Sequence, residues 1–208
     1  MRVRISRSER TEQNRERLLQ AARRVFLAKG FDAATLDQIA EEAGFSKGVV
    51  YSQFESKADV FLTLLERRVT ERAKRQLELA EALNGLGDFD ELFTEVTRIQ
   101  NAEPAWTLLV IEFRVFAARD RKLNRRYAAL HRRAIEGIVR LLRIVYARSG
   151  VEPPAPLETL ATHLLALGNG AALEDLVAAA PVPAAELYRV FRGVLAVPRT
   201  SHRERRAR

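Results

Sequence analysis

The sequence predicts an all-α protein, in which a small front end of three helices precedes a larger helical body, with about nine helices in total. Apolar residues recur at helical spacing along most of the chain, and no alternating pattern of useful length predicts a strand. Groups of proline and glycine separate the periodic segments, and serine or threonine stands where several of them begin. Because 47% of the 208 residues are hydrophobic, the chain has enough apolar side chain to bury a core.

The first predicted helix covers residues 11–29 and has one apolar face. Gly30 follows at the position where a glycine with left-handed backbone geometry often ends a helix. The apolar face consists of Leu18, Leu19, Ala22, Val25 and Phe26.

A second, short helix is predicted over residues 36–43. Thr35 and, three residues later, Gln38 have the spacing of a capping box, in which each side chain bonds to the backbone N–H of the other residue. Gly44 then ends the helix. The inward-facing residues are Leu36, Ile39, Ala40 and Ala43.

Two more helix starts are predicted directly afterwards. Ser46 is placed to cap a third short helix that ends near Phe54. Ser56 with Asp59 repeats the capping-box spacing and predicts a long fourth helix that runs toward Leu83. Beyond a Gly-rich loop, the periodic segments are 88–101, 104–118, 121–149, 157–179 and 183–197.

The second and third helices, joined by a tight turn with a glycine, have the pattern of a helix-turn-helix unit. In such units the second helix enters the major groove of DNA. Val50 and Phe54 are one turn apart and are expected to face the core. The residues left on or near the outside are Lys47, Gly48, Val49, Tyr51, Ser52 and Gln53.

This outer face suits contact with base edges. Lys47 can donate to guanine, Gln53 can pair with a base edge or a phosphate, and Val49 can contact a thymine methyl group. Gly48 has no Cβ, so the helix can approach the bases closely. The alternative is that the unit only serves packing and that Gly48 is a weak point, costing about 1 kcal/mol relative to alanine.

The segment from Thr35 to Leu65 closely resembles the N-terminal domain of the tetracycline-repressor (TetR) family of bacterial transcriptional regulators, and the likeness extends over residues 11–65. The remaining helices fit the arrangement of the family's ligand-binding and dimerisation body. The matching residues are Ile39, Ala40, Ala43, Gly44, Ser46, Lys47, Gly48, Tyr51, Phe54 and Lys57.

The resemblance implies a role for several of these residues. Thr35 would cap its helix beside a DNA phosphate, Tyr51 would reach the backbone or a thymine, and Lys57 would meet a phosphate. Free N–H groups at helix starts suit Thr35, Ser46 and Ser56 as anchors near phosphates. The sequence departs from the family's usual pattern at Gln53, where His or Tyr is commoner, and at Val49, which is often small and polar.

The resemblance also implies three segments: a helix-turn-helix domain at residues 1–56, a ligand-binding and dimerisation domain at 57–198, and a basic tail at 199–208. Aromatic residues in the body could line an apolar pocket between helices, or they could be plain core. Glu112 and Arg114 interrupt an apolar helix and have no assigned role. The candidate pocket residues are Phe93, Trp106, Val110, Phe113, Phe116 and His131.

The last two predicted helices have apolar faces with small residues that permit close approach. In the family the corresponding helices form a four-helix bundle with a second copy, although the same pattern could serve the core of a single chain. The candidate dimer residues are Leu160, Leu164, Leu167, Gly168, Ala171, Leu187, Val190, Phe191 and Val194.

Composition argues against several other classes. The chain has no cysteine, three histidines and no glycine fingerprint, so we expect no metal, no cofactor and no catalytic site. The missing cysteines, together with the lack of an apolar leader or a membrane-length apolar run, predict a reducing cytoplasm and no membrane. Much of the net charge of +8 lies in residues 1–10 and 199–208, which either contact DNA or are solvated ends.

These observations and the resemblance to the TetR family together predict a cytoplasmic, ligand-responsive transcriptional regulator. We expect a repressor that binds a palindromic operator in double-stranded DNA as a homodimer and is released by a small apolar or amphipathic effector. Two alternatives stay open at this point: a DNA-binding dimer without an effector, and a helical enzyme whose site is assembled from distant residues.

Overall fold

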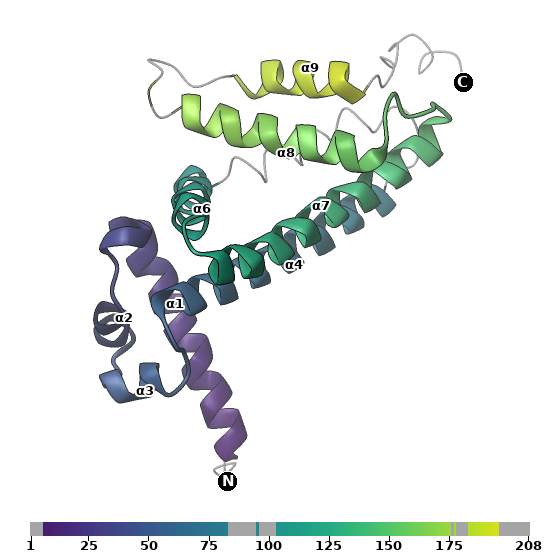
Figure 1. The fold of residues 1–208 in the computed structure, drawn as a ribbon. Coiled ribbons are helices and arrows are strands. Elements are labelled where there is room, and N and C mark those ends of the chain that lie inside the picture. The colour runs from purple at the N-terminus through teal and green to yellow at the C-terminus, as the bar shows by residue number, and fades with distance from the viewer. Residues whose placement is uncertain (1–5, 83–94, 96–102, 176, 178–182, 196–208) are drawn as a thin grey trace. The chain divides into compact units, whose positions relative to one another are not determined.

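A computed structural model describes residues 6–82, 95, 103–175, 177 and 183–195 (Figure 1). All regular structure in these residues is helical, which confirms the all-α prediction. The predicted segment 88–101, apart from residue 95, and the two basic ends lie outside the described residues. The helices are α1 Arg7–Ala33, α2 Leu36–Ala43, α3 Lys47–Tyr51, α4 Lys57–Glu81, α6 Pro104–Ala117, α7 Arg121–Ser149, α8 Leu157–Glu174 and α9 Ala184–Leu195.

Helix α1 begins four residues before the predicted start. The hydroxyl of Ser6 accepts a hydrogen bond from the N–H of Glu9 at 3.1 Å, and the carboxylate of Glu9 accepts one from the N–H of Ser6 at 2.6 Å. This capping box is visible in the sequence as a Ser-x-x-Glu spacing that the periodicity alone does not reveal. Gly30 interrupts the helix with φ 78° and ψ 169°, a geometry that favours glycine, but it is not the left-handed cap that the sequence predicts. One further turn extends to Ala33, and Ala34 is the C-cap.

The contacts divide the chain into two compact units. The first contains residues up to 68 together with 108–130, so it holds α1 to α3, the first half of α4, most of α6 and the start of α7. Its centre is a group of aromatic rings in which Phe31 lies 5.4 Å from Phe61 and 4.9 Å from Phe113, measured between ring centroids. Phe61 and Phe113 stack at 4.5 Å. Such pairs add to the stability that burial of the rings already provides.

The second unit contains residues 69–107 and those from 131 onward. Gly137 of α7 lets α4 approach closely, because a Cβ there would lie 3.2 Å from the Cβ of Ala73. Tyr146 donates a hydrogen bond from its hydroxyl to the carbonyl of Leu195 at 2.6 Å, and burial raises the pKa of Tyr146 to about 12. The buried core consists of Ala80, Val139, Leu141, Leu142, Val145, Tyr146, Leu160, Ala161 and Leu195.

The contact units do not follow the predicted segments residue by residue. The first twelve residues of α4 and residues 108–130 belong to the same unit as the helix-turn-helix. The boundary after residue 56 stays a prediction about domains. Among the described helices, none has the length and apolar character needed to cross a bilayer.

Candidate DNA-binding site

Helix α2 is held at its start by a complete capping box. The hydroxyl of Thr35 accepts a hydrogen bond from the N–H of Gln38, and the amide oxygen of Gln38 accepts one from the N–H of Thr35, both at 3.2 Å. The predicted box is therefore confirmed. Four residues of the helix are buried as expected: Leu36, Ile39, Ala40 and Ala43.

The turn after α2 depends on Gly44. Its backbone has φ 71° and ψ 32°, the left-handed region that glycine adopts without strain. The N–H of Phe45 reaches back to the carbonyl of Ala40 at 2.9 Å, and the N–H of Gly44 bonds to the carbonyl of Glu41 at 3.0 Å. The turn thereby satisfies carbonyls at the end of α2 and directs the chain into α3.

Helix α3 is only five residues long, and it has one buried side and one exposed side. Val50 is fully buried and Phe54, just past the helix, is 2% exposed, as the sequence predicts. Ser46 occupies the N-cap position, but its hydroxyl makes no capping hydrogen bond, so the prediction of a capping role for this side chain is wrong. The outward side is exposed at Lys47, Gly48, Tyr51 and Ser52.

Tyr51 is the most distinctive residue on this surface. It is 57% exposed, although a tyrosine normally buries much of its ring. An exposed aromatic ring with a hydroxyl at its tip can contact an apolar base edge and donate to a phosphate. The role that the resemblance implies for Tyr51 stays a prediction, and its exposure leaves it accessible for that role.

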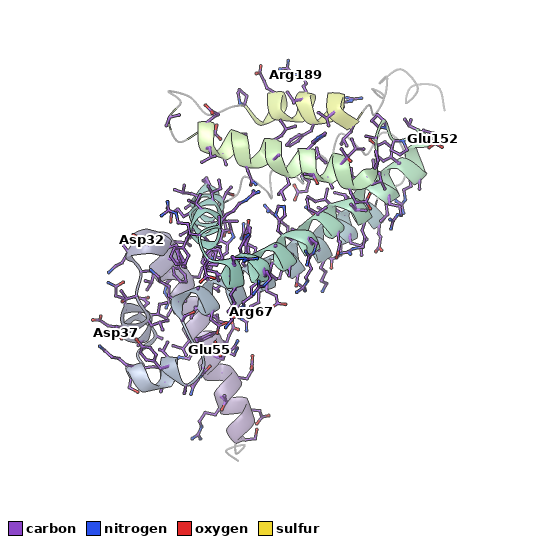
Figure 2. The ribbon with its side chains drawn as sticks, in the orientation of Figure 1. Asp32, Asp37, Glu55, Arg67, Glu152 and Arg189 are labelled. Carbon is purple, nitrogen blue, oxygen red and sulfur yellow. The ribbon has the colours of Figure 1, made fainter. Side chains whose placement is uncertain are left out.

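Lys47 forms an ion pair with Asp37, the residue labelled on α2 in Figure 2. The distance from the ammonium nitrogen of Lys47 to the Asp37 carboxylate is 2.5 Å. This hydrogen bond, with the charge of Asp37, raises the pKa of Lys47. Lys47 therefore stays charged, and because the Asp37 bond uses one of its three N–H donors, the others can donate to a base.

Two of the residues predicted to contact DNA are less exposed to solvent than the sequence suggests. Val49 and Gln53 are both half-buried, and the side-chain oxygen of Gln53 is covered and without a hydrogen-bond partner among the described residues. The base-reading role of Gln53 stays a prediction, and it requires the amide to leave this position. Ser52 uses its hydroxyl to donate to the carbonyl of Val49 at 2.8 Å.

Lys57 stands at the first position of α4. Its ammonium donates to the carbonyl of Asp32 at 2.6 Å and lies 4.8 Å from the ring centroid of Phe31. Burial lowers the pKa of Lys57. An ammonium has three N–H donors, so this contact leaves donors for a phosphate. The phosphate role stays a prediction.

Three side chains that contact the helix-turn-helix or the end of α1 before it have no role that the sequence predicts. Arg15 and Arg17 of α1 donate to carbonyls at Gln53 and Ala43. Glu112 of α6 accepts a hydrogen bond from the N–H of Phe31 at 2.9 Å. Their partners are 26 to 81 residues away along the chain, so no local pattern identifies them.

The predicted pocket residues are spread over different surroundings. Phe113 is fully buried in the aromatic core of the first unit, whereas Phe116 is 44% exposed. Trp106 is buried, Val110 and His131 are half-buried, and Phe93 lies outside the described residues. None of the described members lines the groove of about 380 Å³ between α4 and α7 in the second unit. Its lining is Val69, Thr70, Ala73, Lys74, Leu77, Arg133, Glu136 and Arg140.

The predicted dimer residues also divide into two sets. Leu160, Gly168 and Phe191 are buried within the chain itself. Val190 is 50% exposed, and the half-buried members are Leu164, Leu167, Ala171 and Val194. The side chain of Leu187 is not among those the structure describes. The dimer role of this face stays a prediction.

The part of the chain that the structure describes contains no group of three or more side chains that could together hold a metal ion. The histidines are few, and His131 and His163 are the ones within the described ranges.

Comparison with known proteins gives two matches to family models. The model described as "Bacterial regulatory proteins, tetR family" matches residues 18–64. A second model, "BetI-type transcriptional repressor, C-terminal", matches residues 87–197, more than half of the chain. Together the two models cover the helix-turn-helix and most of the body.

Relatives and solved structures agree with this assignment. The HTH-type transcriptional regulator YfiR of Bacillus subtilis (strain 168) is 26% identical over 163 residues, 78% of this chain and 80% of that protein. The HTH-type transcriptional repressor AcnR of Corynebacterium diphtheriae is 29% identical over 161 residues, 75% of this chain and 77% of that protein. The fold is similar to that of the transcriptional regulator FadR from Bacillus subtilis in complex with stearoyl-CoA, with a TM-score of 0.70 at 13% identity, over 88% of this chain and 99% of that chain. The chain therefore belongs to the tetR family of bacterial regulatory proteins and is a DNA-binding transcriptional regulator.

Proposed function

We propose that this regulator binds a palindromic operator as a homodimer, represses transcription there, and is released by a small apolar or amphipathic effector. The observation that carries the proposal is the two-sided character of α3. Val50 anchors the helix in the core, while Lys47, Gly48 and Tyr51 form a continuous exposed surface on the outside. Donors, an aromatic ring and a missing Cβ on a short helix suit entry into the major groove.

A homodimer follows from the small size of α3. Five helical residues can contact only a few base pairs, whereas two copies related by a two-fold axis contact a palindrome with half-sites about 34–36 Å apart, or a multiple of that distance. Exposed apolar side chains on α9, at the end of α8 and just beyond it support a partner surface there. Val190 is 50% exposed, Leu173 is 42% exposed and Val177 is 81% exposed.

Repression is supported by what is known of related proteins. The model that matches residues 87–197 is described as a repressor, and so is AcnR of Corynebacterium diphtheriae. A bound dimer would exclude other proteins from the DNA that it covers. Reporter transcription from a promoter that overlaps the operator should fall when the chain is present, and a rise would support activation instead.

An amphipathic effector fits the groove between α4 and α7. Val69, Ala73 and Leu77 supply apolar lining, and Lys74, Arg133 and Arg140 supply positive charge. The FadR structure with the similar fold holds stearoyl-CoA, which is itself amphipathic. An effector must bind the DNA-free conformation more tightly than the DNA-bound one, because otherwise it does not shift the equilibrium between the two conformations.

The test begins with selection of preferred sequences from a pool of randomised DNA duplexes, with the full chain as the selecting protein. We expect an enriched palindrome that binds two copies of the chain. Candidate amphipathic molecules are then tested for release of this duplex and for an increase in melting temperature. Enrichment of no sequence would contradict operator binding, whereas an enriched palindrome that no candidate releases would contradict only the effector.

A further inference from the structure

Helix α3 has little stability of its own. It has five residues, one of them Gly48, and no side-chain hydrogen bond caps its start. Isolated helices of this length do not persist in water, so tertiary contacts must fix its position. Val50 and Phe54 bury one side of it, which leaves the two ends to be fixed by other contacts.

Arg17 contacts the turn that precedes α3. A guanidinium N–H of Arg17 donates to the carbonyl of Ala43, the last residue of α2, at 3.3 Å. The same guanidinium lies 4.6 Å from the ring centroid of Phe45 in the turn. A carbonyl at a helix end lacks a partner within its helix, and a positive charge there also suits the helix dipole.

Arg15 makes the equivalent pair of contacts after α3. A guanidinium N–H of Arg15 donates to the carbonyl of Gln53 at 3.3 Å, and the guanidinium lies 4.5 Å from the ring centroid of Phe54. Arg15 lies on the same face of α1 as Leu19 and Ala22, four and seven residues later, so it continues the buried stripe of that helix by one turn. Both ends of the recognition segment are therefore bound by one helix.

The two contacts use properties that arginine has and lysine lacks. A planar guanidinium stacks its flat face on a ring while its edge donates to a carbonyl. The ammonium of Lys57 also meets a carbonyl and a ring, but an ammonium is a compact charge with no planar face, so lysine at positions 15 and 17 does not reproduce the stacked arrangement. Within the described ranges, no carboxylate forms an ion pair with Arg15 or Arg17, so these carbonyls and rings are their protein contacts.

We propose that Arg15 and Arg17 are positioning residues, which hold α3 in its DNA-reading orientation by binding the turns before and after it. The inference rests on the proposed function, because orientation matters only if α3 contacts DNA. Loss of either contact would lower the fraction of molecules whose α3 is correctly oriented, and the apparent affinity for the operator falls in proportion to that fraction.

The test compares three variants that keep the positive charge: Arg15→Lys, Arg17→Lys and the control Arg10→Lys. Arg10 lies on the same helix and is exposed. Affinity is measured for the selected palindrome and for a shuffled duplex of equal length, each at several salt concentrations. We expect Arg15→Lys and Arg17→Lys each to weaken palindrome binding about tenfold, as loss of one hydrogen bond from a charged donor implies, with the shuffled duplex and the salt slope unchanged.

Phe45→Leu is a second variant, which keeps Arg17 and an apolar side chain at position 45 but removes the ring. Its affinity for the palindrome should fall by roughly threefold, less than in Arg17→Lys, because the hydrogen bond from Arg17 remains. Equal affinity for the palindrome in the wild type and both lysine variants would overturn the inference. So would an equal loss on both duplexes with a shallower salt slope, because that pattern identifies direct phosphate contacts. A wild-type chain that prefers no sequence refutes the proposed function itself, which is a different result.

Discussion

The two short helices of the helix-turn-helix are stabilised in different ways. Helix α2 has eight residues, a complete capping box at its start and a glycine that closes its end. Helix α3 has five residues, no side-chain capping bond and a glycine within it. The ends of α2 are therefore specified by its own sequence, whereas α3 is held in place by contacts with the rest of the chain.

The difference reflects what each helix does. A side chain that bonds to its own backbone has fewer donors and acceptors left for DNA. Helix α3 leaves Gly48 and Tyr51 open to solvent and depends on Val50 and on the arginines of α1 for its position. In the proposed function this open face contacts DNA, so DNA binding and the local stability of α3 depend on different residues, and substitutions should separate the two.

The largest effect is expected at Gly48. A Cβ there would lie 3.9 Å from the hydroxyl of Ser46, an ordinary contact, so the fold tolerates a side chain. Gly48→Leu should nevertheless weaken operator binding by about 100-fold or more, because it separates α3 from the bases. Gly48→Ala should weaken binding less and stabilise the helix by up to about 1 kcal/mol. Gel shifts and thermal unfolding measure the two effects, and full operator affinity in Gly48→Leu would refute close approach.

Val50 should carry most of the anchoring of α3. Val50→Ala removes two buried methyl groups and leaves a cavity, so the free energy of unfolding should fall by about 2 kcal/mol. The neighbouring substitution Val49→Ala, at a half-buried position, is the matched control and should cost less than about 1 kcal/mol. Denaturant unfolding compares them, and equal losses would show that α3 is not anchored through Val50.

The caps provide a direct comparison of the two helices. Thr35→Ala removes half of a capping box and should lower the free energy of unfolding by about 1 kcal/mol. Ser46→Ala removes a hydroxyl that makes no capping bond and should stay within about 0.5 kcal/mol of the wild type. If chemical denaturation gives the two substitutions the same cost, the distinction between the helices does not hold.

The smallest effect concerns the pH dependence at Lys47. Asp37 raises the pKa of Lys47 above its ordinary value of 10.5, so the stability from this pair is fully present below that value and is lost as pH rises through the folded-state pKa. Stability near neutral pH should therefore not depend on the titration of Lys47. Asp37→Asn should return the pKa of Lys47 toward the ordinary value, which an NMR titration of its side chain can follow. An unchanged pKa would mean that the Asp37 contact does not persist in solution.

Much of the first unit could be predicted from the sequence because its signals are local. The bounds of α2, the turn at Gly44 and the burial of Val50 follow from cap residues and helical spacing. The early start of α1 at Ser6 also has a local signal, the capping box with Glu9, which periodicity does not detect. The contacts of Arg15 and Glu112 have no such signal, because their partners meet them only in the folded chain.

The roles of the apolar residues in the larger helical body, after the helix-turn-helix, could be predicted less well, for a physical reason. A pocket wall, a dimer face and a core all need inward or partner-facing apolar residues at the same helical spacing. Phe113 and Leu160 are buried within the chain, whereas Phe116 and Val190 are exposed, and periodicity does not separate these cases. The side chain of Ser46 shows a related limit, since a residue can occupy a cap position without making the capping bond.

The central claim is that the outward face of α3 contacts bases in the major groove. Methylation protection of guanine N7, which lies in the major groove, tests it directly on the selected palindrome with the full chain bound. The account predicts two symmetry-related protected patches about one helical turn apart, or a multiple of it, which disappear with Gly48→Leu. Guanines that stay fully reactive at saturating protein, or protection that survives Gly48→Leu, would contradict it.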